Sequence, residues 1–200
     1  MPRLSPLPRS KFGLTAHLTD LAVRRIMGKP IEGTAIMARD PAMLRAGGAM
    51  ERYFLSRRRK TPHRILELVT LRAAMDVGCS FCIDIGSHMV VSKHGVTPEQ
   101  LRGLHAPAGS GLFTPAEVAA LDLAAAMTMT PPTVTDELWA RCAEHFDERQ
   151  LIELTSMIGW ENFRARVNHA LGVESHGFAT DGACAMATSA TETPEPVATS

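Results

Sequence analysis

The sequence predicts an all-α protein, and three observations support that fold class. Ala, Leu and Met are plentiful in the 200 residues, whereas aromatic side chains make up only 5%, a composition that favours packed helices over sheets. Apolar residues recur at helical spacing, as in Ile65, Leu66 and Val69, and no segment alternates with period two for long enough to form a sheet. The third observation is that many helix starts carry recognisable capping residues.

Four helix starts combine a capping side chain with a following proline, at Asp40, Thr61, Thr97 and Thr114. The capping oxygen accepts a hydrogen bond from a free N–H of the first turn, and proline at the first helical position loses no intrahelical hydrogen bond. Thr97, Thr114 and Asp147 also precede Glu or Gln by three residues, which completes a capping box. The predicted helices span residues 14–27, 41–56, 62–76, 79–93, 98–104, 115–128, 135–145 and 148–171.

Glycine and proline mark the ends of these helices. Gly78 separates the 62–76 helix from the next one, and Gly95 closes that next helix. Pro131 and Pro132 force a loop before the 135–145 helix. The helix that follows Gly78 therefore begins at a cysteine.

The sequence predicts a single helical domain over residues 13–178. We expect a flexible arm at residues 1–12 and a disordered tail at residues 179–200, whose Ala, Thr, Ser, Pro and Glu cannot bury a core. The formal net charge is zero, from 21 basic and 21 acidic side chains, which argues against a nucleic-acid partner. No apolar run approaches the roughly 20 residues of a membrane span, and the first residues lack the apolar segment of a signal peptide. We expect a cytoplasmic protein without a membrane partner.

Cys79 and Cys82 are the most informative residues, because they form a Cys-x-x-Cys pair at a predicted helix start. Two thiols at this spacing can close a disulfide, and the free N–H groups of a helix N-terminus lower the pKa of a thiol. Glu67, on the preceding helix, is a candidate for proton transfer. Cys142 and Cys184 stand alone, so a four-ligand zinc site is not predicted, and we expect no cofactor.

A thiol peroxidase needs the groups that this segment supplies. One thiolate attacks the peroxide, a second thiol resolves the sulfenic acid as a disulfide, and a nearby acid or base moves the protons. The alternative interpretation is that both cysteines are small side chains packed in the core.

Residues 67–104 combine a glutamate, an apolar helical segment, the Cys-x-x-Cys pair and a helix that ends at Lys93-His94-Gly95. This frame resembles the carboxymuconolactone decarboxylase and alkyl hydroperoxidase D superfamily, and residues 114–173 look similar as well. The resemblance implies an all-α fold that assembles as a trimer or hexamer. It also implies that Cys82 is the peroxidatic cysteine, Cys79 the resolving one and Glu67 a member of the proton relay.

The chain departs from the hydroperoxidase motif at Gly86, where that motif has a histidine four residues after the second cysteine. On a helix of about 100° per residue, His88 points away from the two thiols, so we expect it on the surface or in packing. His169 is a more distant candidate for the missing relay residue. Dithiol–disulfide exchange does not require the missing histidine, because it needs only two close thiols and a lowered thiol pKa.

The sequence thus predicts an enzyme, an antioxidant thiol peroxidase of the peroxiredoxin type or a dithiol–disulfide oxidoreductase. Its partners would be a small hydroperoxide, an external dithiol electron donor and further copies of the chain. One alternative is a lyase that acts on a small cyclic acid or lactone, with Arg164 or His169 in its pocket. Another is a non-catalytic oligomer that senses redox state. For the Trp160–Arg166 segment, a helix with packed aromatic rings and Arg–Glu ion pairs is preferred to a substrate pocket.

Overall fold

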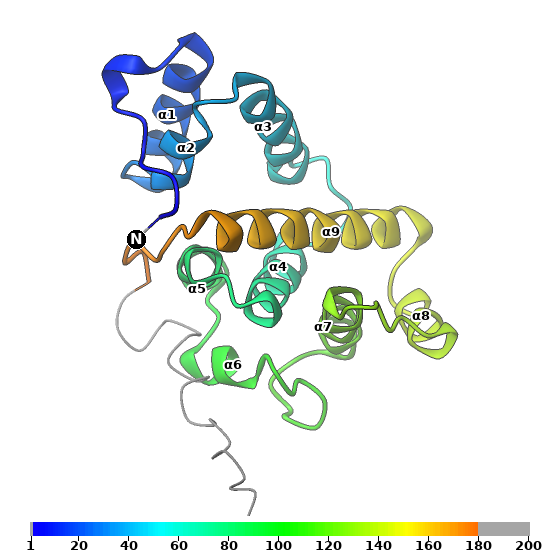
Figure 1. Cartoon of the computed structure of the whole chain (residues 1–200). Helices are drawn as coiled ribbons and strands as arrows, with labels where there is room; N and C mark the ends of the chain where they lie inside the picture. The colour runs from blue at the N-terminus through cyan, green and yellow to red at the C-terminus, as the bar shows by residue number, and fades with distance from the viewer. Residues whose placement is uncertain (1, 180–200) are drawn as a thin grey trace, which may run out of the picture.

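The computed structural model describes residues 2–179, and within that range it contains helices and no strands (Figure 1). The predicted all-α fold class is therefore confirmed. The predicted tail at residues 179–200 lies outside the described residues except for Ala179. The helices are α1 (Leu14–Met27), α2 (Glu32–Met37), α3 (Pro41–Leu55), α4 (His63–Val77), α5 (Ser80–His94), α6 (Pro98–Gly103), α7 (Pro115–Thr128), α8 (Asp136–Ala143) and α9 (Glu148–Leu171), after a 3-10 turn at Arg9–Lys11.

The capping residues act as the sequence predicts at four of the five marked positions. Asp40 accepts hydrogen bonds from two N–H groups of α3, and Thr97, Thr114 and Asp147 each form a complete capping box. The prediction for Thr61 was wrong. Pro62 takes the cap position of α4, and the buried N–H of Thr61 donates instead to Glu153 of α9, at 2.9 Å.

Helix α2 was not predicted, and its start explains why. Ile31 occupies the cap position, and no side chain caps the first turn. A six-residue helix without a capping signal is short enough for tertiary packing to decide its formation. Ile36 of α2 is 2% exposed and packs with the side chains around Cys79, so burial holds this helix in place.

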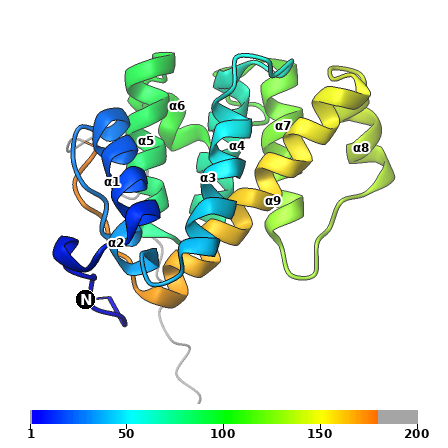
Figure 2. The same cartoon turned by 90° about the horizontal axis from the view of Figure 1, so that it is seen from above.

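Helix α4 lies at the centre of the fold and packs against α5, α7 and α9. In Figure 1, α9 crosses the molecule, with α1–α3 on one side of it and α4–α8 on the other. Figure 2 looks down on the molecule from above, and the α1–α3 group is nearest to the viewer.

The hydrophobic core holds α4 from two sides. Leu66 and Val69 pack against α7 and α9, while Leu68 and Leu71 pack against α5 and α6. Each fully buried side chain of this size contributes about 1.5–3 kcal/mol relative to exposure. Glu67 lies between these apolar positions, so packing on both sides fixes where its carboxyl group lies.

Two buried carboxylates tie distant segments to this core. Glu153 of α9 is 1% exposed and accepts hydrogen bonds from the N–H groups of Lys60 and Thr61. Asp84 of α5, also 1% exposed, accepts hydrogen bonds from the N–H groups of Phe178 and Ala179. The segment after α9 is thereby held against the helix that begins at the cysteines.

The N-terminal arm, residues 2–12, also touches the end of α9. The N–H of Arg3 donates to the carbonyl oxygen of Leu171 at 2.8 Å, and Arg9 pairs with buried Asp20 of α1 at 3.2 Å. Among the described residues, no helix combines the length and the hydropathy that crossing a membrane requires.

Candidate active site

Cys79 is the N-cap residue of α5, and Cys82 lies in the first turn of that helix. Gly78 adopts a left-handed conformation, φ 77°, which ends α4 and turns the chain directly into α5. The Cys79 sulfur accepts a hydrogen bond from the N–H of Cys82 at 3.2 Å, and both cysteines are reduced. The sequence prediction of a Cys-x-x-Cys pair at a helix N-terminus is confirmed.

The two sulfurs differ in exposure and in proton affinity. Hydrogen bonds from the Cys82 thiol and N–H lower the pKa of Cys79, which is 1% exposed. The same thiol–thiol hydrogen bond, together with burial, raises the pKa of Cys82. In the reduced pair Cys82, the less buried of the two residues, therefore holds its proton more tightly than Cys79 does.

Cys82 lines a cavity of about 180 Å³ that α4, α5 and α9 enclose together with α3 and the end of α1. Most of its wall is apolar, with Leu66, Phe81 and Ile85 among the lining residues. A few polar side chains converge there as well, and these are Glu51, His63, Glu67, Thr70, Glu161, Arg164 and Asn168. A small apolar cavity with a few polar groups and a thiol is the usual form of a site for a small ligand.

Glu67 lies in the wall of this cavity, where the sequence prediction requires it. Burial raises the pKa of its carboxyl group, and the positive charges of Arg164 and Lys93 offset part of the rise. A raised pKa keeps more of the group protonated near neutral pH, which suits a proton donor.

Helix α9 presents three polar side chains to the thiols, at the spacing of one helical face. These are Glu161, Arg164 and Asn168, which are separated by three and four residues. The amide Nδ2 of Asn168 donates to the Cys82 sulfur at 3.5 Å. That hydrogen bond lowers the pKa of Cys82 and so opposes the effect of burial.

Arg164 is held by two carboxylates. It pairs with Glu161 on its own helix and with Glu51 of α3, at 2.7 Å. Glu51 also accepts a hydrogen bond from the Trp160 indole at 2.9 Å, and the Trp160 ring stacks on Phe163. The sequence analysis expected packed aromatic rings and Arg–Glu ion pairs here in preference to a pocket, and the Arg164–Glu161 pair agrees with it. Phe163, however, is 44% exposed and Arg164 lines the cavity, so the preference over a pocket is not confirmed. The sequence analysis did not place Glu161 or Asn168 in this cavity, although their spacing from Arg164 was visible in the sequence.

Gly86 also lines the cavity, and its neighbours explain the absence of a side chain. A Cβ atom at this position would lie 3.1 Å from Cδ1 of Leu71, because α5 packs closely on α4. A side chain there would require the Leu71 side chain to shift, in a core that is already closely packed.

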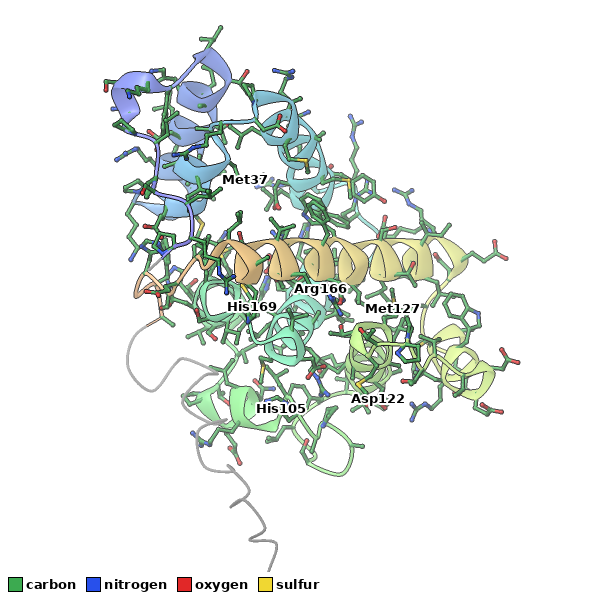
Figure 3. The ribbon with its side chains drawn as sticks, viewed as in Figure 1. Met37, His105, Asp122, Met127, Arg166 and His169 are labelled. Carbon is green, nitrogen blue, oxygen red and sulfur yellow. The ribbon has the colours of Figure 1, made fainter. Side chains whose placement is uncertain are left out.

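The histidines proposed as substitutes lie outside the cavity wall. His88 packs near the Phe178 ring, with 6.4 Å between ring centres, as the prediction of a packing role expected. His169 lies on α9 with Arg166 (Figure 3). Both line a separate hollow, which Asp76 also lines. Of the two residues suggested for a lyase pocket, Arg164 therefore lines the thiol cavity and His169 does not. His63, at the start of α4, does line it.

A second hollow, of about 320 Å³, adjoins the thiol cavity between the α1–α3 group and α9. Its lining is mostly apolar and includes Met37, Trp160 and Phe163. The two hollows share wall residues, and these are Met27, Glu51, Phe81, Ile85, Arg164 and Asn168. Within the described part of the chain, no cluster of three or more His, Cys, Asp or Glu side chains is placed to hold a metal ion.

Solved structures with the same fold include an enzyme and a peroxidase-related protein. The debrominase Bmp8 superimposes with a TM-score of 0.78 at 20% identity, over 93% of this chain and 95% of that one. The alkylhydroperoxidase AhpD core protein of Ralstonia eutropha JMP134 superimposes with a TM-score of 0.76 at 14% identity, over 86% and 90% of the two chains. At these identities the likeness establishes the fold alone.

Sequence comparison identifies the family. The carboxymuconolactone decarboxylase family model matches residues 35–126. The uncharacterized protein YnjA of Escherichia coli (strain K12) is 40% identical over 113 residues, which span 56% of this chain and 62% of YnjA. The uncharacterized protein YdfG of Bacillus subtilis (strain 168) is 36% identical over 107 residues, 53% of this chain and 72% of YdfG. The chain belongs to the carboxymuconolactone decarboxylase family.

Proposed function

We propose that this protein is a thiol peroxidase that reduces an organic hydroperoxide at Cys82 and closes a disulfide onto Cys79. The observation that carries the proposal is the placement of the pair. Cys82 lines an apolar cavity with Glu67, and the buried Cys79 lies within hydrogen-bonding distance of it. The substrate would meet one sulfur, and the second sulfur would be positioned to resolve the product.

The reaction balances with these groups and an external dithiol. The Cys82 thiolate attacks the terminal oxygen of the hydroperoxide, an S–O bond forms, and the O–O bond breaks to release an alkoxide. Cys79 then attacks the sulfenic acid, forming the S–S bond and releasing water. The external dithiol reduces the disulfide and is itself oxidised, so that one hydroperoxide and one dithiol give an alcohol, water and a disulfide.

Glu67 would act as the acid in the first step. The alkoxide that leaves the peroxide needs a proton, and burial raises the pKa of Glu67, which favours the protonated carboxyl group that can supply it. The positively charged Arg164 in the same cavity would stabilise the thiolate and the departing anion.

The lining of the cavity favours an organic hydroperoxide over hydrogen peroxide. The thiol cavity and the adjoining hollow both have mostly apolar walls, and Phe81 and Ile85 belong to both. An apolar group of the substrate would gain free energy by leaving water for this space, at roughly 25 cal/mol per Å² of buried surface. Cumene hydroperoxide should therefore give a higher kcat/KM than hydrogen peroxide.

The test is steady-state consumption of cumene hydroperoxide with a dithiol donor. The Cys82→Ser variant should lose turnover, and the Cys142→Ser variant should keep it. Cys142 is a suitable control, because it is 0% exposed and lies outside the cavity. Its thiol donates a hydrogen bond to the carbonyl oxygen of Ala119. Unchanged turnover in Cys82→Ser would refute the proposal.

A second candidate function is the lyase reaction on a small cyclic acid or lactone, and the observation that favours it is Arg164. A guanidinium group in a small cavity is suited to an anionic substrate. Lactone turnover that survives in a Cys79→Ser/Cys82→Ser variant would support this function against the peroxidase. A variant of the debrominase with this fold binds 2,3,4-tribromopyrrole, so a brominated pyrrole belongs in the same substrate panel.

A further inference from the structure

The hollow beside the thiol cavity is larger than the cavity that Cys82 lines. The thiol cavity has a volume of about 180 Å³, and the hollow between the α1–α3 group and α9 has about 320 Å³. An apolar cavity of about 150 Å³ holds one benzene molecule, and sites for drug-sized ligands measure about 300–1,000 Å³. The thiol cavity alone therefore has little room for a hydroperoxide group together with a ring. With the hollow, the site reaches the size of a typical ligand site.

Charge is confined to the wall that the hollow shares with the thiol cavity. Of the described residues that line the hollow, Glu51 and Arg164 are charged, and both also line the thiol cavity. The residues that line the hollow alone are uncharged, and Met37 lies among them on the α1–α3 group (Figure 3). A ligand that fits both spaces therefore has a polar group at the thiol cavity and an uncharged apolar body in the hollow.

Arg164 offers a hydrogen-bond donor where the two spaces meet. Two of its nitrogens pair with Glu51 and Glu161, but its Nε–H is buried and has no acceptor among the described residues. Such a donor is uncommon in folded proteins, because leaving it unpaired costs free energy. An oxygen atom in the polar group of a bound ligand would be a suitable acceptor.

Helix α3 presents two glycines to the hollow. The residues of α3 that line it share one helical face, and these are Met43, Leu44, Gly47, Gly48 and Glu51. Glycine is less favourable than alanine inside a helix. Close packing does not require it here, because a Cβ on Gly47 would lie 3.8 Å from Cη2 of Trp160, and the nearest atom to a Cβ on Gly48 would be 4.0 Å away. The glycines thus leave open a space that side chains would fill.

We propose that this hollow is a ligand subsite, which binds the apolar group of the substrate while the polar group lies at Cys82. The absence of side chains on α3 sets the size of the subsite, so Gly47 is a specificity-determining residue. The identity of the ligand as a hydroperoxide rests on the proposed function of Cys82. Binding of an apolar ligand in the hollow needs no reaction and can be measured separately.

The first experiment measures binding of N-phenyl-1-naphthylamine to the full chain. This uncharged probe fluoresces more strongly in an apolar site and does not react with thiols. We expect saturable binding to the wild type. The Gly47→Leu variant should bind about tenfold more weakly or worse, because the added side chain occupies the space of the probe.

Gly159→Leu is the matched control for this substitution. Gly159 is also a glycine inside a helix, α9, but an added Cβ there would meet open space, and the residue lines neither the hollow nor the thiol cavity. This variant should bind the probe as the wild type does. If Gly47→Leu does not fold, Gly48→Leu fills the hollow from the neighbouring position, and the same loss of binding is expected.

The second experiment compares kcat/KM for cumene hydroperoxide and tert-butyl hydroperoxide. The two substrates have the same reacting group and differ by a phenyl ring in place of a methyl group. The ratio of the two kcat/KM values should fall about tenfold in Gly47→Leu, because the ring loses its subsite. The ratio should stay unchanged in Gly159→Leu.

The outcomes separate the subsite from the peroxidase activity. Absent or unsaturable probe binding in the wild type would overturn the proposal, as would wild-type binding in a folded Gly47→Leu protein. A second copy of the chain seated in the hollow would exclude the probe and would count against it equally. Peroxidase turnover with an unchanged substrate ratio in Gly47→Leu would also overturn the subsite. Probe binding that depends on Gly47, without any hydroperoxide turnover, would refute the proposed function and leave the ligand site in place.

Discussion

At position 67 a carboxyl group lies in a wall of mostly apolar side chains, and that placement makes its proton affinity testable. Burial raises the pKa of Glu67 above its usual value of 4.5. If Glu67 is the acid, kcat/KM should fall as the pH rises through this raised pKa, because the proton donor is lost. General acid–base catalysis of this kind contributes about 10²–10⁴-fold.

The Glu67→Gln variant should therefore have a kcat/KM that is about 10²–10⁴-fold lower. It should also lack the decrease of kcat/KM with rising pH that ionisation of Glu67 causes. The measurement is the pH profile of kcat/KM for cumene hydroperoxide in both proteins. A variant that retains the wild-type profile would show that another group protonates the leaving oxygen.

Gly86 gives a second prediction for a single residue. A Cβ at this position would lie 3.1 Å from the Leu71 side chain, which is 0% exposed. Replacing the glycine with the histidine of the hydroperoxidase motif should therefore lower the free energy of unfolding, by about 1–3 kcal/mol. Urea denaturation of Gly86→His, Leu71→Ala and the double variant measures this, and the double variant should lose less than the two single losses added together. An unchanged midpoint in Gly86→His would contradict the close packing of α5 on α4.

At the level of elements, the sequence predicted the helices whose starts carry their own signal. Thr97, Thr114 and Asp147 cap helices within a few residues of the chain, so local chemistry was enough. Helix α2 has no capping side chain and depends on the burial of Ile36. Thr61 was misassigned because its partner, Glu153, is 92 residues away in the sequence. Such contacts depend on the tertiary fold, which capping patterns do not encode.

The residues of the candidate active site likewise fall into those that the sequence marked and those that it did not. Cys79, Cys82 and Glu67 were predictable, because a local motif and a family resemblance both mark them. Glu161 and Asn168 come from α9, and only the packing of α9 against α5 brings their side chains to the thiols. Their spacing from Arg164 indicated a shared face, but the sequence could not say which element that face meets.

The segment after α9 offers a prediction for one element. Asp84 accepts hydrogen bonds from the N–H groups of His176, Phe178 and Ala179, and these hydrogen bonds help to lower its pKa against the opposing effect of burial. Asp84→Asn should weaken the attachment, at about 1.5–3 kcal/mol for hydrogen bonds to a charged group. Hydrogen exchange at the Phe178 amide should accelerate in the variant, and exchange at the Leu138 amide of α8, capped by Thr135, should not.

The direction of the Asp84 pKa shift predicts how the attachment of the segment after α9 depends on pH. Because folding lowers the pKa of Asp84, the ionised carboxylate stabilises the folded state at pH values above 3.8, the ordinary pKa of an aspartate. This contribution to stability disappears as the pH falls through the lowered pKa of the folded protein. Protection of Phe178 should therefore persist at pH values near 4 and decline in stronger acid. Loss of protection between neutral pH and about pH 5 would contradict the anchoring role.

For the whole molecule, we propose self-association through α1. Leu14, Leu18 and Leu21 are 76%, 59% and 60% exposed and share one face of the helix, at a spacing of four and three residues. Light scattering should give the mass of a trimer or hexamer for the wild type and a smaller mass for Leu18→Glu. Val134→Glu, at a 39% exposed apolar position in the loop before α8, serves as the control. A monomeric wild type would refute the association.

The central claim is that the Cys79–Cys82 pair reduces hydroperoxide by closing a disulfide. The most direct measurement is a single turnover, in which the reduced protein meets one equivalent of cumene hydroperoxide and its mass and free thiols are then determined. We predict stoichiometric formation of cumyl alcohol, a mass lower by two hydrogens, and protection of both cysteines from alkylation until a dithiol is added. Unconsumed hydroperoxide with both thiols still free would contradict the account.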